Sequence, residues 1–574
     1  MPARLLSLLA APVIRTCLFG AAALLCGTAQ AQTPVWQAAA GAGITQSTGA
    51  LAQVYATVAD ANGNAYITGT FNGTARFGTT LVSSAGSNDA FVAKWNGTTN
   101  AFDWVLPLGG TGSDRGTALA LTGNTLYVAG IFTGTAALGG VQLISAGQED
   151  GFVAKIVDAG SSGNVAWARS AGGSGFDGLT GVAVGTTGVF VTGSFNGTAQ
   201  LGGLSLSSSG SNDVLVAKLT DAGSTASFTW AQRAGGTGPD LAQAIALSGP
   251  NVYVGGYYSS ASAEFGGIPL PNSSLSTIDG FVTKLTDTGA AGNFAWAQRV
   301  SGPADDLVRA LAVRGSTVYA VGNYNSATLS AGPFTLGNNG GFDVLVTKLV
   351  DAGGSASFAW AYNAGGPGGE SSSSVAVAGS HVFLTGGFTS STVSFGGTIL
   401  TNTNTLTDVY LARLTDAGAS ASFTYALSAG AAGDDYGIGL SIGGPRVYVG
   451  GSAGSAAQFG AHTLPPSSTG APTGFIATFT DAAILSTAST DWANALAVYP
   501  NPARHRATVQ LPALPTSAVL ALTDALGRTL WQHTAPPSAA HSTHTVPLGH
   551  LAAGVYYLHV QTGAQSVRRT LAVE

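Results

Sequence analysis

The sequence is poor in charge, in cysteine and in methionine. Only 8% of its 574 residues are charged, whereas an average soluble protein has about 25%. Its two cysteines, Cys17 and Cys26, lie close to the N-terminus, so the rest of the chain has neither disulfide nor thiol chemistry. The 21 basic and 27 acidic residues include no basic run, which excludes the electrostatic footprint of a nucleic-acid-binding protein.

Glycine and apolar residues are abundant instead. The chain contains 83 glycines and is 45% hydrophobic, and this glycine content is about twice the average usage. So much apolar material can build a sizeable core, which excludes disorder caused by low hydrophobicity and high charge. The length leaves room for about three ordinary domains, or for one large repeat array with an appendage.

Residues 1–31 have the pattern of a secretory signal peptide. Two arginines accompany an apolar stretch from Cys17 to Cys26, and the small-residue cleavage pattern Ala29-Gln30-Ala31 follows. The apolar stretch is shorter than the ~20 residues that span a bilayer, and no later segment is a transmembrane candidate. A lipoprotein signal is disfavoured because Leu25 stands where a small residue must precede a lipid-modified cysteine. We expect cleavage after Ala31 and export of a soluble protein.

Residues 32–490 consist of one unit in seven copies, because three independent markers recur with the same period. An aromatic residue recurs at Trp36, Trp104, Trp167, Trp230, Trp296, Trp360 and Tyr425. A string of aromatic and aliphatic residues ends at Gly69, Gly130, Gly193, Gly256, Gly322, Gly386 and Gly451. The pattern Asp-x-Phe-Val-x-Lys begins at Asp89, Asp150, Asp213, Asp279, Asp343 and Asp408, with a degenerate seventh copy at Gly474-Phe475-Ile476.

Each copy is predicted to contain four β-strands. Short stretches such as 65–68 and 252–254 are β-branched and aromatic, and 91–94 alternates with period two. Gly, Asn, Asp and Ser turns separate them, and no segment has a helical period. Seven four-stranded units predict an all-β fold, a seven-bladed β-propeller with long loops after the tyrosine-containing strand. A right-handed β-helix is the structural alternative, but its coils are much shorter than this period.

Several strings in these copies resemble the bacterial β-propeller repeats called SBBP. They are 109–114 (GGTGSD), 126–130 (LYVAG) and 150–155 (DGFVAK), and the resemblance covers roughly residues 36 to 480. It implies a fold and no shared catalytic residues. If the strand order of that family applies, Trp104 lies on the outer strand of the first blade. Trp36 then closes the ring by pairing with the last blade, whose inner strands lie near Leu440 and Tyr448.

Charged residues recur at the same positions in successive copies, which favours a structural role. We interpret each as a turn contact or a blade-to-blade contact, because Asp is favoured in turns; the alternative is a ring of charges that binds a ligand or calcium. The five lysines and one arginine are Lys94, Lys155, Lys218, Lys284, Lys348 and Arg413. Besides the Asp that opens the third marker, one acidic set is Asp158, Asp221, Asp287, Asp351, Asp416 and Asp481, and another is Asp114, Asp177, Asp240, Asp306, Glu370 and Asp434.

The repeat region has no recognisable catalytic, cofactor or metal site. Its two histidines, His381 and His462, do not recur, and a Ser-His-Asp site would need one of them beside a nucleophile. The Gly-rich strings lack the Lys-Ser/Thr ending of a phosphate-binding loop. One further set is aromatic and either stacks on sugar rings at a loop rim or forms core between blades, with recurrence favouring core. Its members are Phe71, Phe132, Phe195, Tyr257, Tyr324 and Phe388.

Residues 491–574 differ in composition and read as a small Ig-like β-sandwich. This segment holds six of the eight histidines and no lysine, and strands alternate at 508–511, 519–522 and 555–560. A metal reading of the pair His541 and His544 is disfavoured, since the pair lies in a Ser/Pro-rich loop. The motifs 498–502 (VYPNP), 524–528 (DALGR) and 551–556 (LAAGVY), with a basic final strand at 567–571, closely resemble the type A sorting domain of the type IX secretion system of Bacteroidota.

This resemblance implies export through the type IX secretion machinery and localisation outside the cell. In that family the tail is usually removed, and the body is released or fixed to the cell surface. We therefore expect a secreted or cell-surface β-propeller that serves as a scaffold for binding or adhesion and is not an enzyme. The alternatives are an enzyme acting on extracellular polysaccharide and a docking platform for another secreted protein. Extracellular glycan or a surface protein is the expected partner, with no nucleic acid and no cofactor.

Overall fold

The computed structural model describes most of the chain after residue 33. The predicted signal peptide lies outside the described residues. These are 34–45, 51–274, 276–454, 456–465, 471–481, 484, 496–512, 514, 517–524, 528–538, 542–549, 551–562 and 565–574.

Seven four-stranded antiparallel units account for the repeat region, and the predicted all-β class is confirmed. In each unit the apolar side chains of the second and third strands are buried almost without interruption, as expected of strands covered on both faces. The innermost strands are β2 (Ala52–Ala59), β6 (Arg115–Thr122), β12 (Gly178–Gly185), β16 (Asp240–Ser248), β22 (Asp306–Arg314), β28 (Glu370–Ala378) and β34 (Tyr436–Gly443). The second strands are β3 (Ala65–Phe77), β7 (Thr125–Phe132), β13 (Gly188–Leu201), β17 (Asn251–Tyr258), β23 (Thr317–Tyr324), β29 (His381–Phe388) and β35 (Arg446–Ala453).

The two outer strands complete each blade. The third strands are β4 (Thr80–Asn96), β10 (Asp150–Asp158), β14 (Leu204–Asp221), β20 (Asp279–Asp287), β26 (Asp343–Asp351), β32 (Asp408–Asp416) and β38 (Thr473–Thr480). The fourth strands are β5 (Ala101–Gly110), β11 (Gly163–Gly173), β15 (Ala226–Ala234), β21 (Gly292–Ser301), β27 (Ala356–Ala364), β33 (Ala421–Ala429) and, from the start of the chain, β1 (Trp36–Thr45).

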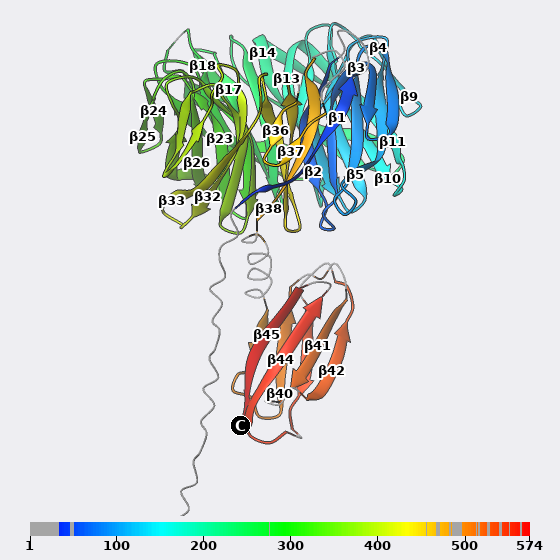
Figure 1. The fold of residues 1–574 in the computed structure, drawn as a ribbon, viewed down its shortest axis with the longest axis vertical. Coiled ribbons are helices and arrows are strands. Elements are labelled where there is room, and N and C mark those ends of the chain that lie inside the picture. The colour runs from blue at the N-terminus through cyan, green and yellow to red at the C-terminus, as the bar shows by residue number, and fades with distance from the viewer. Residues whose placement is uncertain are drawn as a thin grey trace, which may run out of the picture. The chain divides into compact units, whose positions relative to one another are not determined.

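The innermost strands form a closed ring. Each contacts the next in chain order, and β34 of the last blade returns to β2 of the first. The predicted closure is confirmed, because β1 is the outer strand of the last blade and pairs with β38, with Trp36 opposite Phe479. In Figure 1 the dark blue β1 crosses beside the last blade, which contains β38. The predicted place of Trp104 on the outer strand β5 is likewise confirmed.

The extra length of the copies lies between the second and third strands, as the sequence predicts. In five blades it forms separate hairpins: β8–β9 (Thr135–Leu138, Val141–Ile144), β18–β19 (Ser262–Phe265, Ile268–Pro271), β24–β25 (Thr328–Ala331, Phe334–Gly337), β30–β31 (Thr392–Phe395, Thr398–Thr401) and β36–β37 (Gln458–Phe459, His462–Thr463). In the other two blades, long strands continue into it. Each insertion bonds to the outer strand of the preceding blade, for example at Gly109↔Ala137. It therefore covers part of an edge that would otherwise be open to pairing.

The C-terminal segment contains two small antiparallel sheets, in agreement with the predicted sandwich. One sheet is β39 (Ala497–Tyr499), β40 (Arg506–Leu511) and β43 (Ser542–Pro547), and the other is β42 (Thr529–Ala535), β41 (Ala518–Thr523), β44 (Gly554–Thr562) and β45 (Gln565–Val573). Leu520 and Leu558 are among the fully buried core residues. Asn501 of the VYPNP motif donates a hydrogen bond from its amide to the carbonyl of Thr570 (2.8 Å) and accepts one from the amide of Ala572 (2.9 Å). Among the described residues no helix is long and apolar enough to cross a bilayer.

Candidate axial binding site

Every innermost strand carries a β-bulge at the same position. The pairing of each innermost strand with the second strand of its blade shifts by one residue at this position. In β22 the shift lies between Val308 and Ala310, which leaves Arg309 as the extra residue. A bulge inserts one unpaired residue and redirects its side chain, and bulges are common next to functional sites. The seven bulged residues are Tyr55, Thr117, Thr180, Gln243, Arg309, Ser373 and Ile438.

The recurring glycine of the second strand is what allows each bulge to form. A Cβ atom on Gly322 would lie 1.8 Å from the carbonyl oxygen of Leu307, two residues before the bulged Arg309. A side chain cannot fit at that distance, so only glycine lets the inner strand bend there. The same close approach to inner-strand backbone, at 1.8 to 2.2 Å, occurs at all seven marker glycines: Gly69, Gly130, Gly193, Gly256, Gly322, Gly386 and Gly451.

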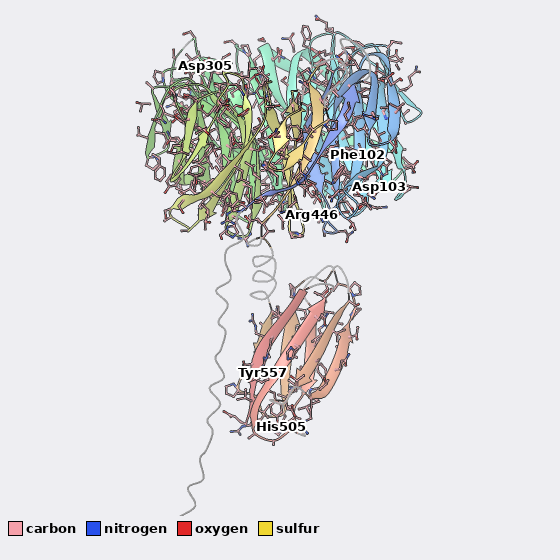
Figure 2. All side chains as sticks on the ribbon, in the orientation of Figure 1. Phe102, Asp103, Asp305, Arg446, His505 and Tyr557 are labelled. Atoms are coloured by element: carbon pink, nitrogen blue, oxygen red, sulfur yellow. The ribbon has the colours of Figure 1, made fainter. Side chains whose placement is uncertain are left out.

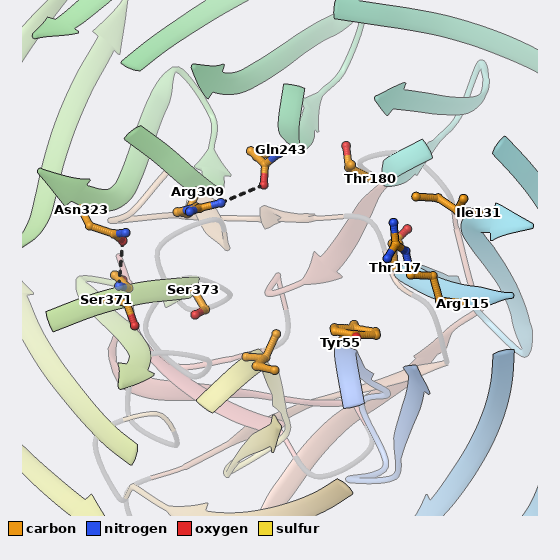
Figure 3. Close-up of a pocket in the computed structure, with 12 residues that line it drawn as sticks. Tyr55, Arg115, Thr117, Ile131, Thr180, Gln243, Arg309, Asn323, Ser371 and Ser373 are labelled. Atoms are coloured by element: carbon orange, nitrogen blue, oxygen red, sulfur yellow. Dashed lines mark hydrogen bonds between the residues drawn. The ribbon is translucent and has the colours of Figure 1, made fainter. Parts of the chain in front are cut away.

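The seven bulged side chains line one cavity of about 450 Å³. Every blade contributes one of them, so the cavity lies on the axis of the ring, and Figure 3 shows the labelled side chains around a common opening. This size is within the range of pockets that hold a small ligand. The remaining lining residues are Arg115, Ile131, Asn323, Ser371 and Ser372.

The seven bulged residues that line the cavity differ from blade to blade, unlike the other marker residues of the repeat. Lysines, aspartates, tryptophans and glycines recur from blade to blade, whereas the bulge position holds Tyr, Thr, Thr, Gln, Arg, Ser and Ile. A residue that serves the scaffold can be identical in every copy, but recognition of an asymmetric ligand needs different groups around it. The sequence analysis missed this site, although its signal is present: it is the variable residue three positions after the recurring acid of the Gly-rich loop, as Arg309 follows Asp306.

Arg309 is a cation in this pocket without an acidic partner. Its guanidinium donates to the amide oxygen of Gln243 (3.4 Å) and lies 5.9 Å from the ring centre of Tyr257. Burial lowers the pKa of Arg309, although Tyr257 opposes this shift. No carboxylate lines the cavity, and none of the ion pairs found among the described residues involves Arg309.

Tyr55 and Arg115 line another part of the cavity. Tyr55 donates a hydrogen bond to Gln53 (2.6 Å). Burial raises the pKa of Tyr55, and the nearby positive charge of Arg115 works against this increase. Arg115 lines the cavity and is half exposed. Its guanidinium lies 3.7 Å from the carboxylate of Glu149, a residue that does not line the cavity. The pocket therefore combines an aromatic phenol, hydroxyls, amides and two guanidinium groups.

The recurring lysines connect adjacent blades, so their structural interpretation is confirmed. Lys218 of the third blade contacts Asp287 of the fourth at 2.7 Å. The same carboxylate accepts a hydrogen bond from the indole nitrogen of Trp230 (3.0 Å). Six interfaces have this ion pair: Lys94–Asp158, Lys155–Asp221, Lys218–Asp287, Lys284–Asp351, Lys348–Asp416 and Arg413–Asp481.

The seventh interface, between the last and first blades, is built differently. Thr478 stands at the lysine position, and the indole nitrogen of the buried Trp36 has no hydrogen-bond partner. Arg446, labelled in Figure 2, instead donates to the backbone carbonyl of Gly97. Pairing of β1 with β38 therefore holds this junction in place of the buried ion pair.

The other two acidic sets lie together in pairs at the blade junctions. A Cβ on Gly235 would be 2.7 Å from one oxygen of Asp240 and 2.8 Å from one oxygen of Asp213, so both carboxylates face the same glycine. The loop acid accepts backbone hydrogen bonds, as Asp240 does from Gly236 (2.6 Å). The six pairs are Asp89/Asp114, Asp150/Asp177, Asp213/Asp240, Asp279/Asp306, Asp343/Glu370 and Asp408/Asp435.

Burial raises the pKa of several acids in these pairs. Burial, and to a lesser degree the neighbouring carboxylate, raises the pKa of Asp114 to about 6, of Asp306 to about 7 and of Asp408 to about 6. One sequence assignment is corrected here. Asp435 and not Asp434 is the sixth loop acid, because Asp435 is fully buried and accepts from the amides of Ala431 and Gly454. Asp434 bonds to the amide of Thr407.

The recurring aromatic residues are core and not a sugar-binding rim. Five of the six predicted residues, among them Phe71 and Tyr324, are fully buried. The sixth, Tyr257, is out of register, because its neighbour Tyr258 is the buried residue opposite Asp279. Tyr257 is half-buried beside Arg309.

Neither histidine of the repeat region lines the axial cavity. His381 begins β29 and contacts Thr415 (3.4 Å), and His462 lies in the hairpin strand β37. His541 is outside the described residues, while His544 contacts His533 at 3.2 Å. Within the described part of the chain, no group of three or more His, Cys, Asp or Glu side chains is arranged to hold a metal ion.

Solved structures similar to the chain include sialidases of Trypanosoma rangeli. The complex with sialic acid has 9% identity and a TM-score of 0.34, and covers 93% of this chain and 88% of that one. The complex with the inhibitor DANA has 8% identity and a TM-score of 0.33, with coverages of 93% and 87%. A mutant with trans-sialidase activity has 7% identity and a TM-score of 0.32, with coverages of 91% and 83%. No curated protein matches the chain.

These neighbours contradict the expectation that the protein is not an enzyme. The structures similar to it are named as sialidases, which are enzymes. The prediction that this protein is not an enzyme is therefore withdrawn. At this level of similarity they assign no activity to this chain.

One family model matches the C-terminal segment. Residues 497–574 match the family described as secretion system C-terminal sorting domain. The match covers the two small sheets β39–β45 and the motifs that the sequence analysis singled out. Residues 497–574 therefore match a secretion system C-terminal sorting domain, which indicates that the protein is exported.

Proposed function

We propose that the protein is exported through the type IX secretion system and binds an extracellular polysaccharide in the axial cavity. The observation that carries this proposal is the ring of seven side chains, of six residue types, at the one bulged position of every blade. The hydroxyl groups of a polysaccharide need many hydrogen-bonding partners at defined positions, and the lining of this cavity is largely polar.

The chemistry of the lining suits a sugar. Gln243 and Asn323 offer amides, and Ser373 offers a hydroxyl that can both donate and accept a hydrogen bond. The hydroxyls of Thr117 and Thr180 donate to the carbonyls of Leu179 (2.6 Å) and Ala242 (2.8 Å) and can still accept. Tyr55 adds an aromatic face against which a sugar ring can pack. A volume of about 450 Å³ is suited to one or two sugar units of a longer chain.

The test measures binding and turnover with the same protein. Full-length protein is applied to an array of extracellular polysaccharides, together with the variant Gln243→Ala/Ser373→Ala and the control Gln142→Ala on the exposed face of β9. We expect the protein and the control to bind the same subset of glycans, and the double variant to bind at least ten-fold more weakly.

The outcome separates the alternatives. An array that stays blank with folded protein, or equal binding by the double variant, overturns the proposal. Release of new reducing ends from a bound glycan, followed over hours, would identify the protein as an enzyme that acts on that polysaccharide. Binding without release would identify a recognition protein.

A further inference from the structure

We propose that the glycan bound in the axial cavity is acidic, and that Arg309 and Arg115 bind its carboxylate group. This inference rests on the proposed function, and it names the chemical class of the ligand. It is carried by the arrangement of charge around the cavity.

The propeller is acidic overall, yet its axis is basic. Residues 32–490 contain 14 basic and 24 acidic side chains. The twelve residues that line the cavity include two arginines and no acid. A ligand that reaches the axis therefore meets a local positive charge within a protein whose other charges would repel an anion.

The cations at the recurring position of the repeat have acidic partners, and Arg309 does not. The six recurring Lys and Arg side chains each contact an aspartate, and Arg233 contacts Asp213 at 2.6 Å. Arg309 has only the uncharged Gln243 and the ring of Tyr257. Removing a guanidinium from water costs free energy unless an anion compensates for it. A cation held in a cavity by neutral groups is therefore suited to an anion that comes from outside.

The position of Arg309 has no structural requirement for arginine. The corresponding bulged residues in the other blades are Tyr, Thr, Gln, Ser and Ile, and all of these blades form the same bulge. The bulge itself depends on the glycine opposite it and not on the side chain at its tip. Figure 3 shows Arg309 beside Gln243 and Arg115 across the same cavity.

A carboxylate fits this pair better than a neutral hydroxyl. A guanidinium offers parallel N–H groups in a plane, which match the two oxygens of a carboxylate. The hydroxyls of Ser371 and Ser373 and the amide of Asn323 border the same space and are suited to the adjacent sugar hydroxyls. Uronic acids combine these two features in one sugar unit.

The experiment compares three probes on full-length protein by titration calorimetry: trigalacturonate, its methyl ester and galactotriose. We expect trigalacturonate to bind, and the ester and the neutral trisaccharide to bind at least ten-fold more weakly. Affinity for trigalacturonate should fall as salt is raised. Equal affinity for all three probes would overturn the inference while leaving glycan binding intact. Failure of every probe, together with a blank polysaccharide array, would overturn both.

Variants test the two arginines separately. Arg309→Gln and Arg115→Gln should each weaken trigalacturonate binding at least ten-fold, whereas the matched control Arg76→Gln, on an exposed position of β3, should not. Unchanged binding by both pocket variants would overturn the inference. Circular dichroism and the melting temperature establish whether each variant is folded. If a variant does not fold, the comparison of trigalacturonate with its methyl ester on the unmodified protein still tests the inference. A sulfated trisaccharide that binds while trigalacturonate does not would also contradict the carboxylate assignment.

Discussion

The ammonium group of Lys218 lies 2.7 Å from the carboxylate of Asp287, and both side chains are almost excluded from water, at 4% and 1% exposure. Lys218 belongs to the third blade and Asp287 to the fourth. Trp230 and Thr187 also donate to the same aspartate. One carboxylate thus gathers three side chains of the preceding blade, and this arrangement recurs around the ring.

Removing one member of this pair should destabilise the propeller strongly. Lys218→Ala leaves the carboxylate of Asp287 buried without its cation, and we expect the free energy of unfolding to fall by about 3–5 kcal/mol. Lys218→Met/Asp287→Asn should recover much of this loss, because it removes both charges and keeps an acceptor for Trp230. Urea unfolding followed by tryptophan fluorescence measures all three proteins.

The second lysine of the recurring set, Lys155, provides the control for that prediction. The pair Lys155–Asp221 is more exposed, at 12% and 16%, so Lys155→Ala should cost less than Lys218→Ala. Equal losses for the two variants would show that burial does not set the strength of these contacts.

Stability should be greatest in mildly acidic solution. In the buried pairs, burial raises the pKa of acids such as Asp306, to about 7, so the folded protein binds protons that the unfolded chain releases near pH 4. The stability that these buried pairs contribute is present below pH 4 and is lost as the pH rises toward 7. For Asp221, burial opposes ionisation, but hydrogen bonds from Lys155, Tyr127 and Trp167 outweigh it and lower the pKa to about 2. The stability that Asp221 contributes is lost as the pH falls below 4.

The melting temperature measured from pH 3 to pH 8 checks this prediction. Asp306→Asn mimics the protonated acid, so it should raise the melting temperature at pH 8 and flatten the decline between pH 4 and pH 7. A melting temperature that rises steadily to pH 8 in the unmodified protein would contradict the assignment of protonated pairs.

Gly322→Ala should damage the axial site through the backbone. Its methyl group would collide with the carbonyl of Leu307 and force the bulge that carries Arg309 to move. We expect at least ten-fold weaker binding of an acidic trisaccharide in a protein that still folds. Gly203→Ala is the matched control, since open space surrounds a Cβ there. Equal binding by the two variants would show that the glycine does not position Arg309.

Deletion of residues 497–574 should prevent export to the cell surface. Asn501→Ala should weaken export as well, because it removes both hydrogen bonds to the final strand β45. Arg504→Ala is the control, because that side chain is 75% exposed. Protease accessibility on intact cells and immunoblots of cell fractions give the distribution. Surface exposure that survives the deletion would contradict the role of this domain.

Much of the fold could be predicted because repetition multiplies a weak local signal. Period-two patterns and Gly-rich turns are ambiguous in one copy, but seven copies predict the strands and their order. The partner of each charge could not be predicted, because Lys94 and Asp158 belong to different copies and meet only when blades pack. The choice between Asp434 and Asp435 likewise depends on register, which places only Asp435 inside the junction.

The sequence by itself determined the repeat, its all-β character and the export domain, because each of these follows from residue patterns that are local or contiguous. Tertiary structure alone decided the candidate site. Tyr55 and Arg309 are more than 250 residues apart in the chain, and they share a cavity only because the ring closes and each inner strand bulges toward its axis. A closed ring converts one position per repeat into a single surface, and no linear pattern reveals that surface before closure.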